Sequence, residues 1–229
     1  MSNEKPVAVA RDKAYWLTAR LEAALAAGDI DEAEWHRQGS QVITSAYLAA
    51  DTPWGQSGKS GDENSWSYAR SLICDAVHRD GTFLDVGCAN GYLMECMKKW
   101  KAERGLCIEP HGLDISPELA DLARSRLVGW ADRIYTGNVM TWSPPQRFDF
   151  VRTGLEYVPA RRRRDLVHRI IDEFVSDSGR LIVGTYYGVC SGPDALEQEI
   201  SSWGFDVAGH TSRPHGDDRF SYRVLWIDA

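Results

Sequence analysis

Apolar positions in the first part of the chain follow a helical period. Leucines recur at four-residue spacing, as a helix with one buried face requires: Leu17, Leu21 and Leu25. This spacing predicts a helix over residues 14–27, ended by a glycine, and a second helix from Asp31 onward. Residues 51–62 are rich in Gly, Ser, Pro and Asp, which predicts a loop. We therefore expect a helical extension over residues 1–62 and a separate domain over residues 63–229.

The pattern changes in that second part of the chain. After a short helix expected over residues 64–78, short apolar strands alternate with amphipathic helices. The expected strands are residues 82–86, 112–115, 133–136, 148–152 and 180–185. Such alternation argues for a parallel sheet with helices on both faces. The end differs, because a helix over residues 193–203 precedes two strands, 205–209 and 221–227, joined by a polar loop. This closing hairpin predicts a last strand antiparallel to the others.

Composition and charge narrow the class of protein. Hydrophobic residues make up 43% and charged residues 26% of the 229 residues, as in a soluble globular protein. The net charge of −7 repels phosphate backbones, which weighs against a nucleic-acid partner. No apolar stretch reaches the ~18 residues of a membrane span, and the polar first residues do not resemble a signal peptide. We expect a cytoplasmic protein without a membrane partner. The sequence leaves the oligomeric state open, a homodimer included.

The five cysteines are odd in number and never form a C-x-x-C pair. Neither a disulfide framework nor a cysteine-rich zinc site is therefore expected, and reduced thiols are the default interpretation.

The most informative segment is residues 83–93, FLDVGCANGYL. An apolar strand ends in Asp85, followed by a turn with small residues at Gly87, Ala89 and Gly91, and then by a helix. Glycine at position 87 permits a backbone conformation that a side chain would block, and small residues let a ligand approach the main chain. The helix presents free N–H groups and its positive dipole end to that ligand. In open parallel sheets, ligands bind beyond the carboxyl ends of the strands.

This segment resembles motif I of the class I S-adenosylmethionine-dependent methyltransferases. The usual form of that motif is acidic-x-Gly-x-Gly-x-Gly, and Ala89 replaces the middle glycine here. The resemblance implies that the methionine end of S-adenosylmethionine is held by Asp85, Gly87 and the neighbouring backbone at Cys88, Ala89 and Gly91.

Two further elements follow in the family's order. Asp114 ends the second strand, where its carboxylate can accept hydrogen bonds from both ribose hydroxyls, and Ile115 stands next to it. Asn138, followed by Val139, stands where many family members have aspartate. Its amide oxygen can accept a hydrogen bond from the adenine amino group. These four residues complete the predicted adenosine site.

The segment 147–158, RFDFVRTGLEYV, resembles the fourth-strand motif that borders both cofactor and acceptor. It places Thr153 among the cofactor-binding residues. No cluster of carboxylates and amides with the spacing of metal ligands accompanies this strand, since Arg152 and Thr153 stand there. We therefore expect no metal ion.

The resemblance covers residues 81–229 and implies a fold and an activity. The fold is a Rossmann-like, doubly wound, mostly parallel seven-stranded sheet with an antiparallel last strand, here with an N-terminal helical extension. The activity is in-line transfer of a methyl group from S-adenosylmethionine. Because that methyl group arrives activated, positioning alone can lower the barrier by ~7–11 kcal/mol. A general base is needed only if the acceptor atom enters protonated.

Candidate catalytic and acceptor residues lie in connections expected at one rim of the sheet. His210 and His215, in the loop expected between the last two strands, and Tyr157 are candidates for a general base; a surface-loop role is the alternative for the histidines. Six aromatic residues could wall an apolar acceptor pocket: Trp54, Trp66, Tyr68, Tyr157, Tyr186 and Tyr187.

Analogy with the family favours a small-molecule acceptor, such as a secondary metabolite. Two alternatives stay open. An RNA or protein methyltransferase predicts a basic strip that includes Arg161–Arg164 beside the cleft, although a solvated surface is the plainer interpretation of that run. A non-catalytic cofactor-binding or interaction protein predicts a closed acceptor pocket. A nicotinamide-binding domain is disfavoured, because the turn reads G-x-x-x-G instead of G-x-G-x-x-G.

Overall fold

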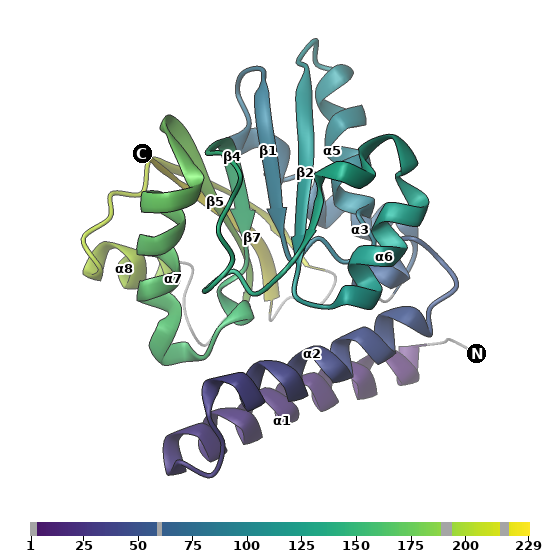
Figure 1. The fold of residues 1–229 in the computed structure, drawn as a ribbon, viewed down its shortest axis with the longest axis vertical. Coiled ribbons are helices and arrows are strands. Elements are labelled where there is room, and N and C mark those ends of the chain that lie inside the picture. Colours follow the sequence, from purple (N-terminus) through teal and green to yellow (C-terminus); the bar gives the residue numbers. More distant parts are fainter. Residues whose placement is uncertain (1–3, 59–60, 189–193, 216–219) are drawn as a thin grey trace.

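In a computed structural model, which describes residues 4–58, 61–188, 194–215 and 220–229, seven strands form one sheet (Figure 1). Their order across the sheet is β3-β2-β1-β4-β5-β7-β6, and β7 alone runs antiparallel to its neighbours. The strands are β1 (Gly81–Val86), β2 (Ile108–Asp114), β3 (Ile134–Thr136), β4 (Phe148–Thr153), β5 (Val175–Gly188), β6 (Gly209–Pro214) and β7 (Phe220–Asp228). The predicted Rossmann-like sheet with an antiparallel last strand is confirmed.

Helices cover both faces of this sheet (Figure 1). They are α1 (Glu4–Ala27), α2 (Glu32–Leu48), α3 (Glu63–Arg70), α4 (Ile73–Ala76), α5 (Tyr92–Ala102), α6 (Pro117–Arg126), α7 (Arg163–Arg169), which continues as a π-helical turn over Ile170–Phe174, and α8 (Ala195–Ser202). Short polar side chains begin several of them. The Asp31 carboxylate accepts from the Glu34 amide at the start of α2, and Ser116 caps α6, whose first residue is Pro117.

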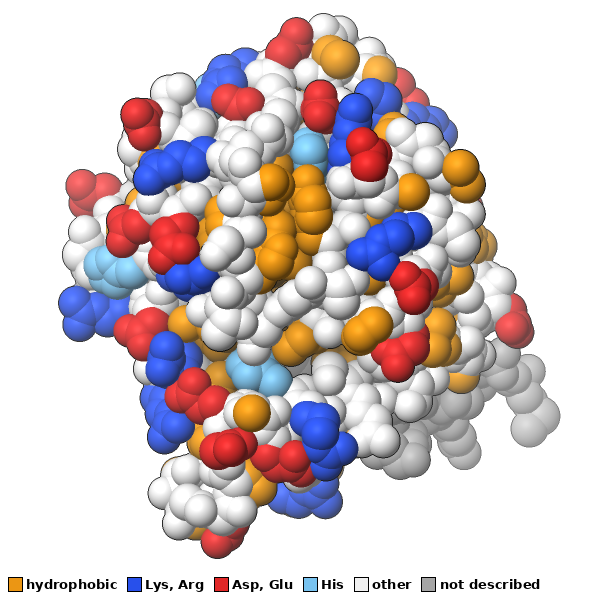
Figure 2. Space-filling model, viewed as in Figure 1, with side chains coloured by type: hydrophobic (Ala, Val, Ile, Leu, Met, Phe, Trp, Pro, Cys, Tyr) orange, Lys and Arg blue, Asp and Glu red, His pale blue; other side chains and the backbone are white. Residues whose placement is uncertain are grey.

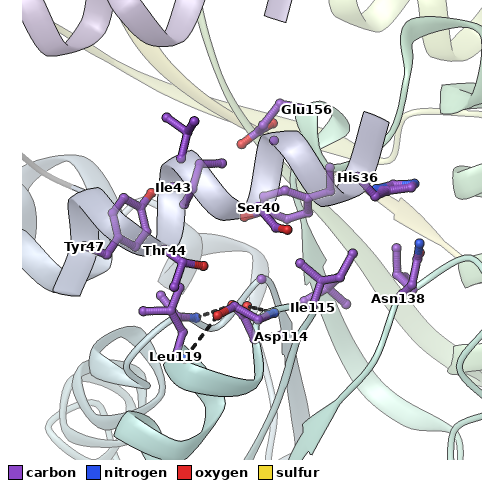
Figure 3. Close-up of a pocket in the computed structure, with 18 of the residues that line it drawn as sticks. His36, Ser40, Ile43, Thr44, Tyr47, Asp114, Ile115, Leu119, Asn138 and Glu156 are labelled. Carbon is purple, nitrogen blue, oxygen red and sulfur yellow. Dashed lines mark hydrogen bonds between the residues drawn. The ribbon is translucent and has the colours of Figure 1, made fainter. Parts of the chain in front are cut away.

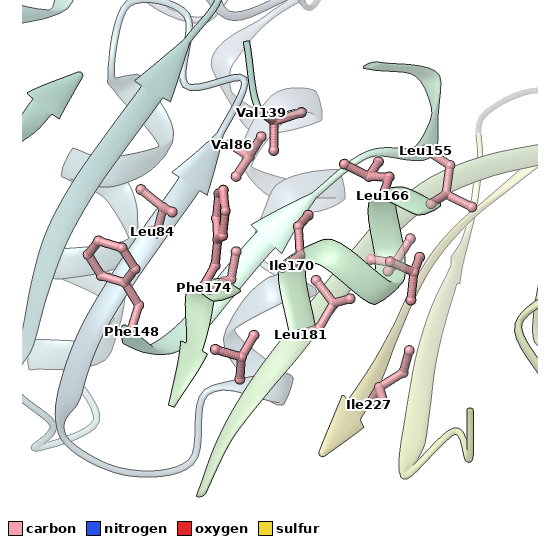
Figure 4. Packing of buried hydrophobic residues seen from close by; sticks show 14 of the residues in the cluster. Leu84, Val86, Val139, Phe148, Leu155, Leu166, Ile170, Phe174, Leu181 and Ile227 are labelled. Carbon is pink, nitrogen blue, oxygen red and sulfur yellow. The ribbon is translucent and has the colours of Figure 1, made fainter. Parts of the chain in front are cut away.

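Alternate residues of each strand supply two hydrophobic layers. On β1, Phe83 faces the side covered by α3, α4 and α5, whereas Leu84 faces the side covered by α7. In the second layer, Leu84 and Leu181 lie opposite Ile170 and Phe174, all fully buried (Figure 4). Burial of each such side chain contributes about 1.5–3 kcal/mol. This packing fixes the carboxyl ends of the strands, from which the candidate site is built.

Two predicted elements differ from the structure. The strand expected over residues 205–209 is wrong, because pairing with β7 begins only at Gly209; Phe205 and Val207 are partly buried against the core without joining the ladder. The helix expected over residues 64–78 is broken between α3 and α4. There the Tyr68 carbonyl accepts a hydrogen bond from the Arg213 guanidinium of β6, at 2.6 Å, in place of the next turn's amide.

Helices α1 and α2 form a hairpin that lies across the carboxyl ends of β1 and β2 (Figure 1). Its own core consists of Leu21, Leu25 and Trp35, each no more than 6% exposed. Of the predicted leucine stripe, Leu21 and Leu25 are thus buried, and Leu17 is partly buried. Among the described residues, no helix is long and apolar enough to cross a membrane.

The hairpin is anchored to the sheet domain by the start of the arginine run. The Glu22 carboxylate accepts from the Ala160 amide at 3.1 Å, and the Glu32 carboxylate pairs with Arg161 at 3.1 Å and Arg162 at 3.5 Å. Arg163 lies 3.9 Å from Glu199 of α8. Three of the four arginines therefore have acidic partners.

Candidate cofactor-binding site

A cavity of about 190 Å³ lies between the α1–α2 hairpin and the carboxyl ends of β1, β2 and β3. Its floor comes from the connections that follow these strands, and its roof comes from α2 (Figure 3). This position agrees with the general rule that ligands of open α/β sheets bind at the carboxyl edge. Six of the predicted cofactor-binding residues line it: Gly87, Ala89, Asp114, Ile115, Asn138 and Val139.

The turn after β1 has a shape that depends on glycine. Gly87 has φ +75°, and a Cβ there would lie 2.6 Å from Cζ of Tyr157. Gly91 has φ +74°, and a Cβ would lie 2.6 Å from Cδ1 of Leu127. Gly87 therefore lets the Tyr157 ring pack directly against the main chain, whereas Gly91 allows α5 to pack closely.

Asp114 is fixed by the backbone around it. One carboxylate oxygen accepts from the Ala89 amide and the other from the Ser116 amide, both at 2.8 Å. Burial raises the pKa of Asp114, and the two amide hydrogen bonds oppose that shift. Each carboxylate oxygen keeps lone-pair capacity for a further donor, and the residue lines the cavity. The geometry suits a pair of adjacent hydroxyl groups.

Asn138 presents a different group to a ligand than the sequence suggested. Its amide oxygen accepts from the Met140 backbone N–H at 2.9 Å. The Nδ2 group makes no hydrogen bond to any described residue, so it is available as a donor beside Ile115 and Val139. The amide oxygen, which we expected to accept from the adenine amino group, therefore already accepts from the backbone. Donation from Nδ2 to a ring nitrogen of the ligand suits the structure better.

Four predicted cofactor residues do not line the cavity. Asp85, which is 1% exposed, lies beneath the glycine turn and forms an ion pair with Arg152 of β4 at 3.2 Å. Cys88 packs its side chain among buried residues between α5 and α6, and the Thr153 hydroxyl donates to the Gly154 carbonyl. With Gly91, these residues support the turn from behind. A direct role for them in cofactor binding stays a prediction.

Of the aromatic residues proposed for the acceptor, the structure brings Tyr157 to the cavity. Its ring lies against Gly87, and its hydroxyl accepts from Nη1 of Arg152 at 2.9 Å. Burial raises the pKa of Tyr157, which disfavours a phenolate at this position. Glu156 also lines the cavity, on the far side of α2 in Figure 3.

The other aromatic candidates lie elsewhere. Trp66 is fully buried in the core, the indole N–H of Trp54 donates to the Gly61 carbonyl, and Tyr68 is 45% exposed, edge-on to Tyr222. Tyr186 and Tyr187 belong to β5, but their side chains lie outside the described part of the chain.

The candidate histidines do not line the cavity either. His210 lies within β6 instead of the expected loop, 3.5 Å from the Glu197 carboxylate, because the strand begins at Gly209. His215 follows β6 and lies with its ring 5.1 Å from that of Tyr222. Their proposed part as general base has no support from this placement.

Sequence reasoning missed the residues of α2 that form the roof. His36, Ser40, Thr44 and Tyr47 recur every three or four positions and share one face of the helix. Figure 3 shows His36 on the side of Asn138, and Thr44 and Tyr47 on the side of Leu119. Burial lowers the pKa of His36, so its ring is neutral near pH 7. The recurrence of these polar residues at helical spacing was the feature of the sequence that could have indicated a ligand-facing side of α2.

In the described ranges, no group of three or more His, Cys, Asp or Glu side chains could hold a metal ion.

Comparison with known proteins identifies the fold. No protein-family model matches the sequence, and no curated protein matches it. Among solved structures, the N-methyltransferase NodS from Bradyrhizobium japonicum WM9, in complex with S-adenosylhomocysteine, is similar with a TM-score of 0.63 and 14% identity over 82% of this chain and 96% of that chain.

Two further structures are comparable. The 1,6-didemethyltoxoflavin-N1-methyltransferase from Burkholderia thailandensis, with bound 1,6-didemethyltoxoflavin and S-adenosylhomocysteine, has a TM-score of 0.63 and 16% identity, covering 87% of this chain and 90% of its own. The [4+2]-cyclase SpnF has a TM-score of 0.61 and 14% identity, covering 84% and 95%. The strand order, the glycine turn and these likenesses together show that the chain has the fold of the class I S-adenosylmethionine-dependent methyltransferases.

Proposed function

We propose that this protein is an S-adenosylmethionine-dependent methyltransferase that acts on a small molecule. One observation carries the proposal: a backbone-fixed carboxylate, Asp114, and the glycine turn at Gly87 line one cavity at the carboxyl edge of this fold. Two structures of the same fold, NodS and the toxoflavin methyltransferase, contain S-adenosylhomocysteine, which supports this choice of cofactor.

The residues present fit the cofactor. Asp114 would accept from the ribose hydroxyls, and the Nδ2 group of Asn138 would donate to the adenine ring between Ile115 and Val139. The main chain at Gly87 and Ala89, which line the cavity, would hold the methionine end. When bound, S-adenosylmethionine supplies a methyl group already activated on a sulfonium. The protein's own task is then to orient the acceptor and exclude water.

A small acceptor suits the roofed cavity better than a macromolecule. We propose that residues 1–62 act as a lid on a methyltransferase domain over residues 63–229, since α2 closes the cavity from above. Charges of both signs are interspersed over the face shown in Figure 2, and Arg161, Arg162 and Arg163 have acidic partners. These features disfavour the basic strip that an RNA methyltransferase requires.

Isothermal titration calorimetry with S-adenosylhomocysteine tests the cofactor assignment. Asp114→Ala is expected to weaken binding about 10- to 100-fold, because a hydrogen bond to a charged group contributes about 1.5–3 kcal/mol. Asp121→Ala, an exposed carboxylate on α6, is the matched control and should bind like the wild type. An Asp114 variant with unchanged affinity would refute the ribose role, and a wild-type protein that does not bind would refute the proposal as a whole.

The transfer reaction needs its own assay. A metabolite extract incubated with a methyl-labelled donor should yield labelled small molecules with the wild-type protein, and about 10- to 100-fold less with Asp114→Ala at limiting donor. Binding of S-adenosylhomocysteine without any transfer would favour a non-catalytic cofactor-binding protein.

A further inference from the structure

A second, smaller recess lies between α3 and the β5–β7 pair. Its volume is about 20 Å³, which holds one or two waters or a group of carboxylate size. Arg70 and Arg223 form its polar walls, and Gly184 of β5 forms its floor. A recess of this size between two guanidinium groups is suited to a small anion, because the planar guanidinium binds both oxygens of a carboxylate.

Arg152 lies next to Gly184, beside this recess. The register of β4 and β5 pairs it with Ile182, so its side chain shares a sheet face with Gly184. Its Nε and Nη2 atoms lie 4.0 Å from the position that a Cβ would take on Gly184. Nη1 makes the hydrogen bonds to Asp85 and Tyr157, whereas Nε is buried and has no partner among the described residues. An unsatisfied buried donor destabilises the protein, and a bound anion would remove that cost.

Arg70 supplies the uncompensated charge. It is half-buried, and within the described ranges it makes no hydrogen bond or ion pair. Arg223, by contrast, pairs with Glu197 at 2.8 Å and Asp194 at 3.5 Å, and Arg152 pairs with Asp85. Two of the three arginines thus have carboxylate partners within the protein, and the third faces the recess.

Tyr157 lies between the cofactor cavity and the arginines beside the recess. Tyr157 lines the cavity, and its hydroxyl accepts from the same Arg152 whose other edge faces Gly184. The charge of Arg70 also acts to lower the pKa of Tyr157 and of Asp85, against the larger effect of burial. An acceptor that extends from the cavity past Tyr157 would place an anionic end at Arg70 and the rest of the molecule beside Tyr157.

We propose that the acceptor of this protein carries a carboxylate group, bound in the recess by Arg70 and by the free edge of Arg152. This inference rests on the proposed function, and it deepens it by naming the substrate class. The methionine end of the cofactor also carries a carboxylate. The test therefore has one arm for binding of a carboxylate, one for the cofactor and one for the acceptor.

In the first arm, sodium formate is titrated into the protein while the arginine Nε–H signals are followed by ¹H–¹⁵N NMR, with formamide and sodium chloride as controls. We expect formate, and neither control, to shift the Nε–H signals of Arg70 and Arg152. Arg70→Gln should weaken this response at least fivefold, and Arg133→Gln, a paired arginine at the opposite edge of the sheet, should not. Equal responses to formate and formamide would overturn the proposal.

A second variant, Gly184→Ala, blocks the recess sterically and is expected to fold like the wild type. A Cβ on Gly184 would lie 4.0 Å from its nearest neighbours, an ordinary contact, so Gly184→Ala should fold normally and fill the recess. It should abolish the response to formate, whereas Gly129→Ala, which has open space around its Cβ, should leave it intact. A full formate response in Gly184→Ala would place the anion elsewhere and overturn the proposal.

The cofactor and acceptor arms use the same variants. Arg70→Gln and Gly184→Ala should bind S-adenosylhomocysteine like the wild type; a tenfold loss in both would assign the carboxylate to the cofactor and overturn the inference. In the extract assay, methyl-accepting activity should be retained by an anion-exchange resin, and Gly184→Ala should lower kcat/KM for that fraction at least tenfold. Activity confined to the unretained fraction would also overturn it. A protein that binds formate but not S-adenosylhomocysteine would refute the proposed function instead.

Discussion

At the scale of single residues, the buried pair of Asp85 and Arg152 links the stability of the fold to pH. The two residues are register neighbours on β1 and β4, 1% and 3% exposed. Burial raises the pKa of Asp85 to about 6, although Arg152 acts in the opposite direction. Burial acts to lower the pKa of Arg152, but Tyr157 and Asp85 outweigh it, so this guanidinium stays charged. The pair therefore holds a proton-binding group beneath the glycine turn.

This pKa predicts how stability changes with pH. The folded protein binds more protons at Asp85 than the unfolded chain does between about pH 4 and pH 6, so the contribution of Asp85 to stability falls as pH rises through that window. The full change is about 3 kcal/mol, since each pKa unit corresponds to about 1.4 kcal/mol. Urea unfolding of wild type and Asp85→Asn from pH 4 to pH 7 measures it. We expect the free-energy difference between the two proteins to change across this window; a constant difference would contradict the shifted pKa.

Residues whose role follows from their own chemistry could be predicted from the sequence. Gly87 and Asp114 end strands at the carboxyl edge, and both line the cavity. Partners brought together by strand register could not be predicted. Arg152 lies far from Asp85 in the chain, and only the pairing of β1 with β4 shows that Asp85 faces Arg152 and not the cavity. For Asn138, the hydrogen bond that its Oδ1 accepts from the Met140 amide leaves Nδ2 as the group available to a ligand, and the sequence did not show this bond.

At the scale of elements, the α1–α2 hairpin has a small hydrophobic core of its own, separate from the cores of the sheet. Its helices bury Leu21, Leu25 and Trp35 against each other, while charged contacts from Glu22 and Glu32 attach it to the sheet domain. Exposed ion pairs contribute only about 0–1 kcal/mol each. The hairpin should therefore open at far lower cost than the sheet unfolds.

Trp35→Ala is expected to loosen the hairpin selectively. Removal of a buried tryptophan side chain costs about 3–5 kcal/mol, and Trp35 is 6% exposed. Amide hydrogen exchange should accelerate over α1 and α2 and stay unchanged over β1 and β4, and affinity for S-adenosylhomocysteine should fall. Trp16→Ala, which truncates a tryptophan of α1 that is 73% exposed, is the control and should do neither. Faster exchange throughout the sheet would show that the hairpin is no separate unit.

Elements with a clear hydrophobic period were predicted well, because burial on one face dictates that period. The leucines of α1 and the apolar strands β1 and β4 are examples. The errors occur where a distant hydrogen bond overrides local preference. Arg213 interrupts the helix predicted over residues 64–78, and alternation at Phe205 and Val207 reflects packing without strand pairing.

At the scale of the whole molecule, the order of the strands could be anticipated only through the family resemblance. Alternating strands and helices indicate a parallel sheet, but the order β3-β2-β1-β4-β5-β7-β6 depends on contacts between distant segments. The roof of the cavity lay outside what the family motifs cover, since those motifs begin at β1. The sequence motifs thus predicted the floor of the cavity, whereas its roof became known only from the structure.

Ligand binding should stabilise the molecule as a whole. At a concentration of S-adenosylhomocysteine 100 times its dissociation constant, the gain is about 2.7 kcal/mol. For a chain of this size, that corresponds to a rise in Tm of roughly 5–10 °C. Differential scanning fluorimetry measures the shift, with NADH at the same concentration as the control. A shift with NADH and none with S-adenosylhomocysteine would favour a nicotinamide-binding protein.

The attachment of α2 to the arginines that precede α7 has a consequence for the order of folding. Glu32 and Arg161 are 129 residues apart in the chain. Closing so long a loop is entropically costly until the intervening sheet has formed. We therefore expect the hairpin to dock late during folding and to detach before the sheet unfolds. Under the proposed function, S-adenosylhomocysteine can leave when the hairpin opens, so product release does not require the sheet to unfold.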